Sequence, residues 1–320
     1  MNGNFIISLD FELFWGVSET RTIASYRENL SNTREVVKKL LSLFLENNIE
    51  ATWASVGFLF FSNKKELAAY TAKNKKTPNY KKRNLDNFEI ISKINQKDNN
   101  FYFAKDLINK IYLTKGQEIS THTFSHFYSL EKGVTDQNFH QDLSSAIAIA
   151  NDENIKIKSI VFPRNQYNDK IISICKIAGI KSYRGNSTHP IYKPSVDQGY
   201  SKRMLRLLDS YLNITGHHCF KLENKDELLN IPASRFLRPY NKRFFLLESL
   251  KINRILNSMT YAAKNNLNYH LWWHPHNFGT NIDENFKNLE RIIIHQKKLK
   301  KKYEFRSINM KNLQKFTHKQ

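Results

Sequence analysis

The sequence predicts an α/β fold built around a parallel β-sheet. Short apolar segments of strand length alternate along the chain with longer segments that have helical periodicity, an order typical of repeated strand–helix–strand units. Polar residues with catalytic potential follow directly after several of the expected strands. Because loops at the carboxyl ends of parallel strands build the active site in such folds, this coincidence points to an enzyme.

The first strand–helix–strand unit occupies residues 5–57. Residues 5–9 are apolar and predict a buried strand, and residues 51–57 predict a second one. Between them, residues 26–47 carry apolar side chains at helical spacing, and Ser31 or Asn32 is the expected cap of the main body of this helix. A strand, a helix and another strand at this spacing indicate two parallel strands.

The later elements continue this pattern. Apolar or β-branched runs predict further strands at residues 117–120, 159–162, 180–183 and 269–273. Helical periodicity predicts helices at residues 136–151, 170–178, 246–266 and 284–302, and Gly179 is a standard C-terminal stop for the second of these. Residues 187–235 are less regular, with an apolar tract near residues 205–208 and a polar strand expected near residues 211–215.

One stretch interrupts the pattern. Residues 62–115 are rich in Lys, Asn and Tyr, and they are expected to form irregular or helical structure inserted before the third strand. Such an insertion either shapes a substrate cleft or is a passive surface excursion, and both alternatives stay open. The chain has 320 residues and no internal repeats, and we expect a single domain over residues 1–320 with this insertion.

The composition predicts a folded and strongly basic protein. Hydrophobic residues make up 40% of the chain, which excludes a disordered protein. Lys and Arg number 50 against 29 Asp and Glu, so the net charge of +21 attracts polyanions such as nucleic acid, anionic lipid headgroups or phosphorylated sugars. Much of the excess lies in Lys-rich runs, at residues 74–76, 81–83 and 297–302, which are also typical of ordinary solvated faces.

Cysteine usage and hydropathy bear on localisation. Cys175 and Cys219 have no spacing typical of a disulfide framework or a zinc knuckle, which fits a reducing cytoplasm. The N-terminus lacks the basic region of a signal peptide. The longest apolar stretch, residues 51–61, is shorter than the about 20 residues that span a bilayer. We therefore expect a soluble, cytoplasmic protein whose charge could attract it to a membrane surface.

A candidate metal site follows two of the expected strands. His122 and His126 stand four residues apart after the third strand, and imidazole is the commonest side-chain ligand for zinc. Asp10 and Glu12 follow the first strand and offer a carboxylate as the third ligand. A divalent ion at this position would polarise a carbonyl group and lower the pKa of a bound water molecule. The pattern therefore indicates metal-assisted hydrolysis.

The remaining polar groups supply the other roles that hydrolysis requires. The carboxylate that is not a ligand could act as general base, and Arg164 could pair with it and keep it ionised. His274 could give a proton to a departing amine from the opposite side. Each residue also has a simpler interpretation: the histidine pair as an ordinary loop, the two acids as helix caps, Arg164 as a surface residue, and His274 and His276 as core-edge residues.

Five segments resemble, in order, the motifs of the polysaccharide deacetylase family (carbohydrate esterase family 4, the chitooligosaccharide-deacetylase homology domain). The resemblance runs from about Phe5 to Gly279, and its segments are Ser-Leu-Asp-Phe-Glu at 8–12, the strand at 51–57, Ser-Thr-His-Thr-Phe-Ser-His at 120–126, Phe-Pro-Arg-Asn at 162–165 and Leu-Trp-Trp-His at 271–274. Two features depart from the family pattern. Phe11 separates the two acids that are usually adjacent, and Pro163 precedes Arg164 where the family has Arg-x-Pro.

The resemblance implies a distorted, incomplete (β/α) barrel of about seven parallel strands. It also implies removal of N- or O-acetyl groups from sugars with zinc or another divalent ion. On this basis the metal ligands are Glu12, His122 and His126, the catalytic base is Asp10, the residue that orients the base is Arg164, and the general acid is His274.

The resemblance also bears on the substrate and on two alternative functions. Lack of a signal peptide points to an acetylated sugar conjugate made inside the cell, such as a nucleotide- or lipid-linked sugar of surface-polysaccharide synthesis, and the basic charge suits an anionic substrate. A glycoside hydrolase or a cyclic-amide hydrolase on a related barrel is the first alternative. A non-catalytic module that binds sugar or a polyanion is the second, although no nucleic-acid-binding motif accompanies the charge.

Overall fold

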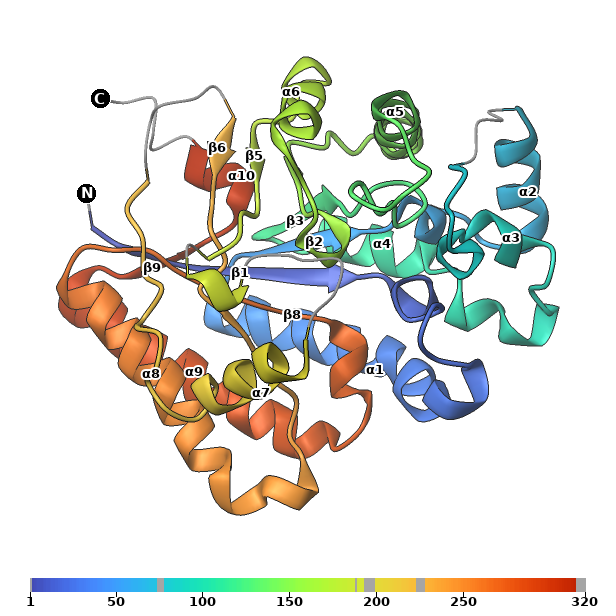
Figure 1. The fold of residues 1–320 in the computed structure, drawn as a ribbon. Helices are drawn as coiled ribbons and strands as arrows, with labels where there is room; N and C mark the ends of the chain where they lie inside the picture. Colours follow the sequence, from blue (N-terminus) through green and yellow to red (C-terminus); the bar gives the residue numbers. More distant parts are fainter. Residues whose placement is uncertain (1, 74–77, 188, 193–198, 223–227, 315–320) are drawn as a thin grey trace.

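The computed structural model describes residues 2–73, 78–187, 189–192, 199–222 and 228–314, and it contains a curved parallel sheet surrounded by helices (Figure 1). Within these residues nine strands follow the order β6-β5-β4-β3-β2-β1-β8-β7, with β9 paired to β1, and all strand pairs are parallel. The strands are β1 (Asn4–Phe11), β2 (Ala51–Ser55), β3 (Gln117–Thr121), β4 (Ser159–Ile160), β5 (Ser182–Tyr183), β6 (Leu229–Asn230), β7 (Arg235–Phe236), β8 (Tyr269–Trp273) and β9 (Arg306–Ile308).

The sheet curves into a distorted barrel because one short segment supplies both of its outer strands. β6 and β7 lie at opposite ends of the strand order, yet only four residues separate them in the sequence. The amide of Ile231 donates to the carbonyl of Tyr183 in β5, and the amide of Ser234 donates to the carbonyl of His270 in β8. β6 and β7 have two residues each, so the barrel is incomplete. The predicted fold class is confirmed.

Long helices cover the outside of the sheet. The helices are α1 (Ile23–Asn47), α2 (Lys64–Lys73), α3 (Phe88–Ile91), α4 (Lys105–Leu113), α5 (Asp136–Asp152), α6 (Asp169–Ile177), α7 (Tyr200–Asp209), α8 (Glu248–Lys264), α9 (Ile282–Tyr303) and α10 (Met310–Leu313). The expected cap of the first helix is wrong, because α1 begins earlier than predicted. Thr22 is its N-cap, and its hydroxyl oxygen accepts a hydrogen bond from the amide of Ser25.

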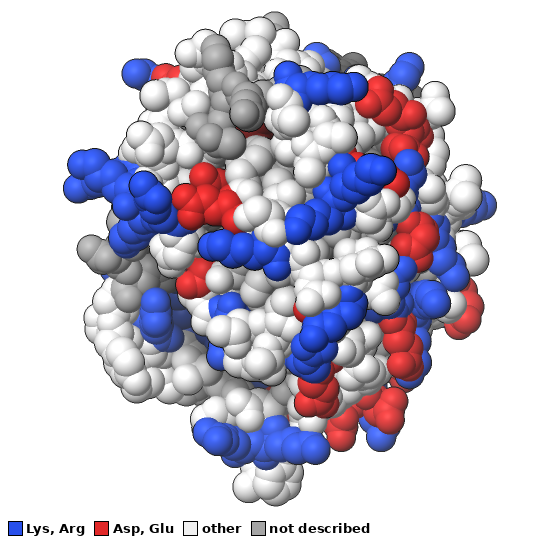
Figure 2. All heavy atoms as spheres, turned by 90° about the vertical axis from the view of Figure 1, so that its right-hand side faces the viewer, with Lys and Arg blue, Asp and Glu red and all other residues white. Residues whose placement is uncertain are grey.

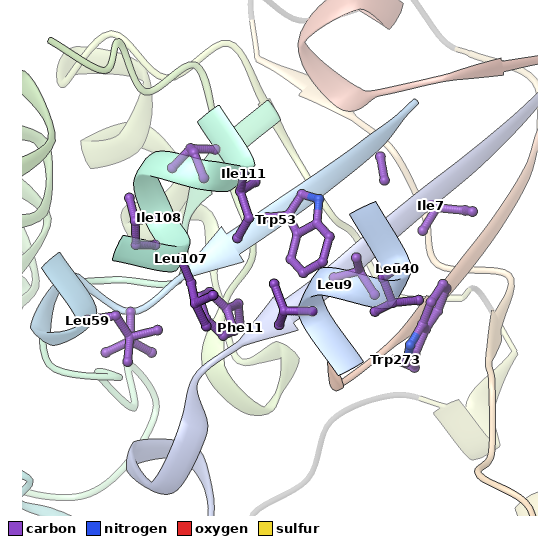
Figure 3. Packing of buried hydrophobic residues seen from close by; sticks show 14 of the residues in the cluster. Ile7, Leu9, Phe11, Leu40, Trp53, Leu59, Leu107, Ile108, Ile111 and Trp273 are labelled. Atoms are coloured by element: carbon purple, nitrogen blue, oxygen red, sulfur yellow. The ribbon is translucent and has the colours of Figure 1, made fainter. Parts of the chain in front are cut away.

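Successive side chains along each strand point alternately outward, into a core beneath the helices, and inward, into the barrel interior. In β1, Phe5, Ile7, Leu9 and Phe11 point toward the covering helices, so the residues between them point inward. Figure 3 shows Leu40 of α1, Trp53 of β2, Trp273 of β8 and the α4 residues Leu107, Ile108 and Ile111 packed around this outer face. The side chains of the central strands are buried on both faces, as expected for a parallel sheet.

The barrel interior changes from apolar to polar along its axis. A second apolar cluster fills the inside, and the short helix α10 contributes Met310 and Leu313 to it. Near this end, the buried carboxylate of Glu118 accepts hydrogen bonds from Thr52 and Ser159. Toward the carboxyl ends of the strands, Ser8 and Asp10 of β1 face inward. The sequence pattern therefore places polar chemistry at one mouth of the barrel.

One predicted strand is wrong for a physical reason. Residues 211–215 form a turn and not a strand, because the buried carboxylate of Asp209 accepts hydrogen bonds from the amides of Ile214 and Thr215 and bends the chain back. The nine strands of the described residues agree with the expected barrel of about seven, and β6, β7 and β9 are too short to leave an apolar run in the sequence. Among the described residues, no helix has the length and hydropathy required to cross a membrane.

The inserted segment is ordered and helical over most of its described residues. It contains α2, α3, α4 and two short 3-10 helices, and residues 74–77, which include the Lys-rich run at 74–76, lie outside the described residues. Its buried Asn87 donates hydrogen bonds from Nδ2 to the carbonyls of Trp15 and Ser125. These carbonyls belong to the loops that follow β1 and β3, so the insertion braces the site loops. Whether residues 1–320 form a single domain stays a prediction.

Candidate metal centre and active site

Three of the predicted residues converge at the carboxyl mouth of the barrel. Oε2 of Glu12 lies 3.1 Å from Nε2 of His126 and 3.3 Å from Nε2 of His122. One potential ligand atom from each side chain lies within 4.8 Å of the other two, and all three residues are buried. No other group of three such side chains converges in this way in the described part of the chain. One carboxylate oxygen and two imidazole nitrogens form a donor set that suits zinc.

The loop after β1 turns sharply to bring Glu12 to this position. Leu13 has a φ of +49°, and the short 3-10 helix Leu13–Gly16 starts there without a side-chain cap from Glu12. The capping interpretation of Glu12 is therefore wrong. Gly16 passes directly beneath the carboxylate, and a Cβ atom at Gly16 would lie 1.9 Å from the Cδ of Glu12. A residue without a side chain is required at position 16.

The loop after β3 presents both imidazole rings to Glu12. Thr123 and His126 have positive φ values of 65° and 61°, so the loop folds back within four residues. Nδ1 of His122 lies 2.8 Å from the carbonyl oxygen of Val161. Since a carbonyl can only accept, Nδ1 carries the proton and Nε2 turns its lone pair toward the centre. This is the usual way in which a metal-binding histidine is oriented.

Buried Asp142 of α5 holds the histidine loop in shape. Its carboxylate accepts hydrogen bonds from the amides of Phe124 and Ser125 and from the hydroxyl of Ser125. Gly57 adds a further support, since its amide donates to the carbonyl of Thr123 at 2.9 Å. Burial raises the pKa of Asp142 to about 6. Sequence reasoning missed this residue because it lies in the middle of a predicted helix, with no local signal of a role.

Asp10 is held by an arginine, but not by the predicted one. Nη1 and Nη2 of Arg184 donate to Oδ1 and Oδ2 of Asp10 at 2.6 and 2.8 Å, in a bidentate pair. Nη2 also donates to Oδ1 of Asn165, and Nη1 donates to the hydroxyl of Ser8. The guanidinium lies 4.2 Å from the ring centroid of Trp272. Arg184 is buried inside the barrel mouth, so it has little freedom to leave this pairing.

The prediction that Arg164 orients Asp10 is corrected by this geometry. Arg164 has a φ of +52°, which directs its side chain away from the barrel axis toward Glu19 and Glu131, with which it forms ion pairs. Its guanidinium also lies over the ring of Tyr128. The sequence held a weak signal for the true partner, because Arg184 also follows an expected strand and precedes Gly185.

His274 faces the two carboxylates from the end of β8. Its Nε2 lies 3.7 Å from Oδ2 of Asp10 and 3.5 Å from Oε1 of Glu12, and its side chain keeps partial exposure to solvent. His276 stacks against this ring, with the ring centroids 5.1 Å apart. The buried Nδ1 atom of His276 has no hydrogen-bond partner among the described residues, which argues against its interpretation as a core histidine satisfied by backbone carbonyls.

The electrostatics of the cluster favour ionised acids and lower the pKa of His126 and His276. Burial acts to raise the pKa of Glu12, but His274, His122 and His126 together hold it well below its usual range. Burial likewise opposes the ionisation of Asp10, and Arg184 outweighs it, so the pKa of Asp10 is lowered. Burial lowers the pKa of His276 to about 3. The centre therefore carries two carboxylates that are ready to bind a cation or to accept a proton.

A cavity opens beside this cluster. Its volume of ≈ 550 Å³ is in the range of small-ligand sites. Trp272, which contacts Arg184, forms part of its lining together with Asn165, the partner of Arg184. Figure 2 looks onto the face that is on the right in Figure 1, toward which the arrow of β1 points, and Lys and Arg side chains are distributed over it.

Comparisons with known proteins support the fold. No family model and no curated protein sequence matches the chain. A solved structure described as a polysaccharide deacetylase from Mycobacterium smegmatis matches with a TM-score of 0.61 and 12% identity, covering 99% of this chain and 90% of that one. Another so described, from Pseudomonas aeruginosa, matches with a TM-score of 0.53 and 11% identity, covering 99% of this chain and 90% of that one.

The same fold also occurs with other activities. A branching enzyme of glycoside hydrolase type from Pyrococcus horikoshii matches with a TM-score of 0.57 and 12% identity, covering 99% of this chain and 71% of that one. The protein has the fold of the polysaccharide deacetylases, and the resemblance seen in its sequence motifs is confirmed at the level of structure. Because the branching enzyme shares this fold, the reaction has to be argued from the site itself.

Proposed function

We propose that the protein is a metal-dependent hydrolase that removes an acetyl group from a sugar, with an N-acetyl group as the expected target. The observation that carries the proposal is the convergence of Glu12, His122 and His126 beside an Asp10–Arg184 pair and opposite His274. The similarity to polysaccharide deacetylase structures supports the same reaction class. In this proposal zinc is the expected ion.

The two carboxylates have different surroundings, which supports distinct roles for them. Both oxygens of Asp10 lie in the fork of Arg184, whereas Oε2 of Glu12 faces the Nε2 atoms of both histidines. Glu12 is therefore the proposed ligand and Asp10 the proposed base. A divalent ion held by Glu12, His122 and His126 would supply an activated water and polarise the acetyl carbonyl.

The protein's own groups then move the protons. Asp10, kept ionised by Arg184, accepts a proton from the attacking water while the oxygen of that water bonds to the carbonyl carbon. When the bond between that carbon and the sugar nitrogen breaks, the amine needs a proton. His274 approaches from the far side of the two carboxylates and is partly open to solvent, so it is placed to supply this proton. The products are acetate and an amino sugar.

A glycosidase is a weaker interpretation of this site. Cleavage of a glycosidic bond normally uses one free carboxylic acid and one carboxylate on opposite sides of the bond. Here Asp10 is locked by Arg184, and Glu12 faces two imidazole rings. Neither acid is available as a proton donor to a glycosidic oxygen, because the pKa of each is lowered.

Release of acetate tests the proposal directly. Purified protein loaded with zinc is incubated with N-acetylated sugars, and acetate and reducing ends are measured in the same samples. We expect acetate without new reducing ends, and a loss of at least about 100-fold in kcat for Asp10→Asn, which cannot accept the proton. New reducing ends without acetate would instead show a glycosidase, and acetate release by Asp10→Asn at the wild-type rate would exclude Asp10 as the base.

A further inference from the structure

Helix α7 exposes its apolar side and buries a charged residue, the opposite of a helix that packs on a hydrophobic core. Tyr200, Met204, Leu205 and Leu208 lie on one side of α7 at helical spacing, and all four are exposed, with Tyr200 at 85%. The residue of α7 that is fully buried is Asp209, a charged one. Helices of soluble proteins normally turn the apolar stripe inward. The apolar side of α7 therefore has no partner within the described residues.

A second group of exposed apolar side chains lies just before α8. The 3-10 helix η7 (Lys242–Leu247) exposes Phe244, Phe245, Leu246 and Leu247, with Leu246 at 78%. The loop after α7 joins the two segments, because Nε of Arg254 in α8 donates to the carbonyl of Leu212 at 3.3 Å. We call this surface, formed by residues 200–214 and 242–250, the α7–η7 face.

Every exposed charge on the α7–η7 face is positive. Its acidic residues are Asp209 and Glu248, and both are buried and paired, Asp209 with Arg235 and Glu248 with Lys251. The exposed charged residues are cationic, and they are Arg203, Lys242 and Arg243, with the half-buried Lys202 and Arg206 beside them. Exposed aromatic and leucine side chains among cations form the pattern of a surface that binds at the lipid–water interface.

We propose that the α7–η7 face docks on an anionic lipid bilayer. The apolar side chains would enter the headgroup region, where their transfer out of water is favourable, and the surrounding cations would contact lipid phosphates. A second protein copy would fit less well, because two such faces would oppose like charges across the contact. The net charge of +21 adds long-range attraction to an anionic membrane.

An arginine-lined pocket lies between α7 and two residues that contact Arg184, Asn165 and Trp272. The cavity of ≈ 550 Å³ is lined by Arg203 and Arg206 of α7 and by Arg235, Arg238 and Trp272, and the one carboxylate among its described lining residues is that of Glu19. That carboxylate is already paired with Arg164. The pocket therefore has more cationic than anionic lining residues, and they lie next to α7.

The buried guanidinium of Arg235 makes the pocket suitable for binding an anion. The Arg235 side chain is only 4% exposed, and its Nη1 donates to Asp209. Its Nε and Nη2 atoms are buried and form no hydrogen bond of normal geometry with the described residues, and the phenol groups of Tyr192 and Tyr269 lie nearby. Buried guanidinium donors rarely stay unpaired. The next step rests on the proposed deacetylase function. The pocket binds the phosphate of a lipid-linked sugar, and the acetyl group of that sugar reaches the metal centre.

Vesicle sedimentation tests the docking face without any measurement of activity. Vesicles of phosphatidylcholine, with or without phosphatidylglycerol, are mixed with the 320-residue protein. We expect sedimentation with the anionic vesicles and release by salt. Changing both Phe245 and Leu246 to Ser should weaken binding by at least about tenfold. The matched control changes Leu113 and Ile177 to Ser, since these side chains are also exposed, at 81% and 80%, but lie on α4 and α6, and it should bind like the wild type.

The same assay can overturn the docking proposal. Equal binding of the Phe245→Ser/Leu246→Ser variant and the wild type to anionic vesicles would exclude the α7–η7 face. Absence of wild-type binding, together with a dimer that the double variant abolishes, would make the face a protein–protein interface. Equal wild-type binding to neutral and anionic vesicles would refute the role of the cations.

Substrate selectivity tests the arginine pocket. The variant Arg238→Gln removes a cation of the pocket and does not alter a residue of the metal centre. Acetate release by this variant and by the wild type is compared for three substrates. They are a prenyl-phosphate-linked N-acetylglucosamine in vesicles, a soluble nucleoside-diphosphate-linked N-acetylglucosamine and a neutral N-acetylglucosamine oligomer. We expect the KM for the lipid-linked sugar to rise at least tenfold, with no change for the neutral oligomer. Equal effects on all substrates, or preference for the soluble nucleotide sugar, would refute the lipid assignment. If no substrate releases acetate, the proposed function and the pocket assignment fail together, whereas vesicle binding still decides the docking face.

Discussion

At the scale of single residues, the candidate site depends on the arginine that holds Asp10. The guanidinium of Arg184 reaches both carboxylate oxygens inside the barrel mouth, and Trp272 packs against its face. A lysine could not reproduce this planar, two-point contact. The burial that makes the contact rigid also makes it costly to break, because removal of one partner leaves the other charge unpaired.

Replacing this arginine should affect catalysis and not metal binding. We expect Arg184→Gln to lower kcat by about 100-fold, because Asp10 loses both its orientation and its ionised state. The matched variant Arg164→Gln should keep nearly the wild-type kcat, since Arg164 pairs with Glu19 and Glu131. Both variants are assayed for acetate release and metal content. A larger loss in Arg164→Gln than in Arg184→Gln would restore the original prediction from the sequence.

Sequence reasoning found most of the site but could not assign every partner. Asp10, Glu12, His122, His126 and His274 each follow a strand that the apolar pattern predicted, so topology alone brings them to one mouth of the barrel. The identity of the arginine could not be predicted in this way. Two arginines follow adjacent strands, and only the left-handed backbone at Arg164 turns it away.

At the scale of elements, the site loops are held by groups far from them in sequence. Asp142 lies in the middle of α5, and Asn87 lies in the inserted segment, yet both bind the backbone of the histidine loop. Such contacts leave no periodic signal, because they depend on how the elements pack. The long strands and helices were predictable, whereas the two-residue strands and the turn at 211–215 were not.

Releasing the histidine loop should weaken metal binding. Asp142→Ala removes the acceptor for the amides of Phe124 and Ser125, so His122 and His126 lose their fixed positions. We expect zinc affinity to fall by about 10- to 100-fold, which is typical for loss of an indirect support. Zinc competition with a chelator dye measures this affinity. Asp152→Ala, an exposed change on the same helix, is the control, and equal affinities of the two variants would refute the role of Asp142.

At the scale of the whole molecule, the polar barrel interior couples stability to pH. His270 is fully buried, with Nε2 2.8 Å from the hydroxyl of Ser8, and burial lowers its pKa to about 3. Below a pH of about 6.5 the unfolded chain binds a proton at this histidine while the folded protein does not. Stability therefore decreases as the pH falls from about 6.5 to about 3.

This coupling can be measured by denaturation. The free energy of unfolding, followed with urea between pH 7 and pH 4, should fall by about 1.4 kcal/mol per pH unit from this one group. His270→Gln should reduce the slope by that amount, whatever its effect on stability at neutral pH. An unchanged slope in the variant would show that His270 titrates in the folded protein as it does in the unfolded chain.

The central claim is that Glu12, His122 and His126 hold a divalent ion. The most direct measurement is the metal content of the purified protein by elemental analysis, compared with a variant in which His122 and His126 are both changed to Ala. We predict about one zinc or similar ion per wild-type chain and none in the variant, while His140→Ala, an exposed histidine on α5, keeps the wild-type content. Equal, stoichiometric metal in the wild type and in the double variant would contradict the account.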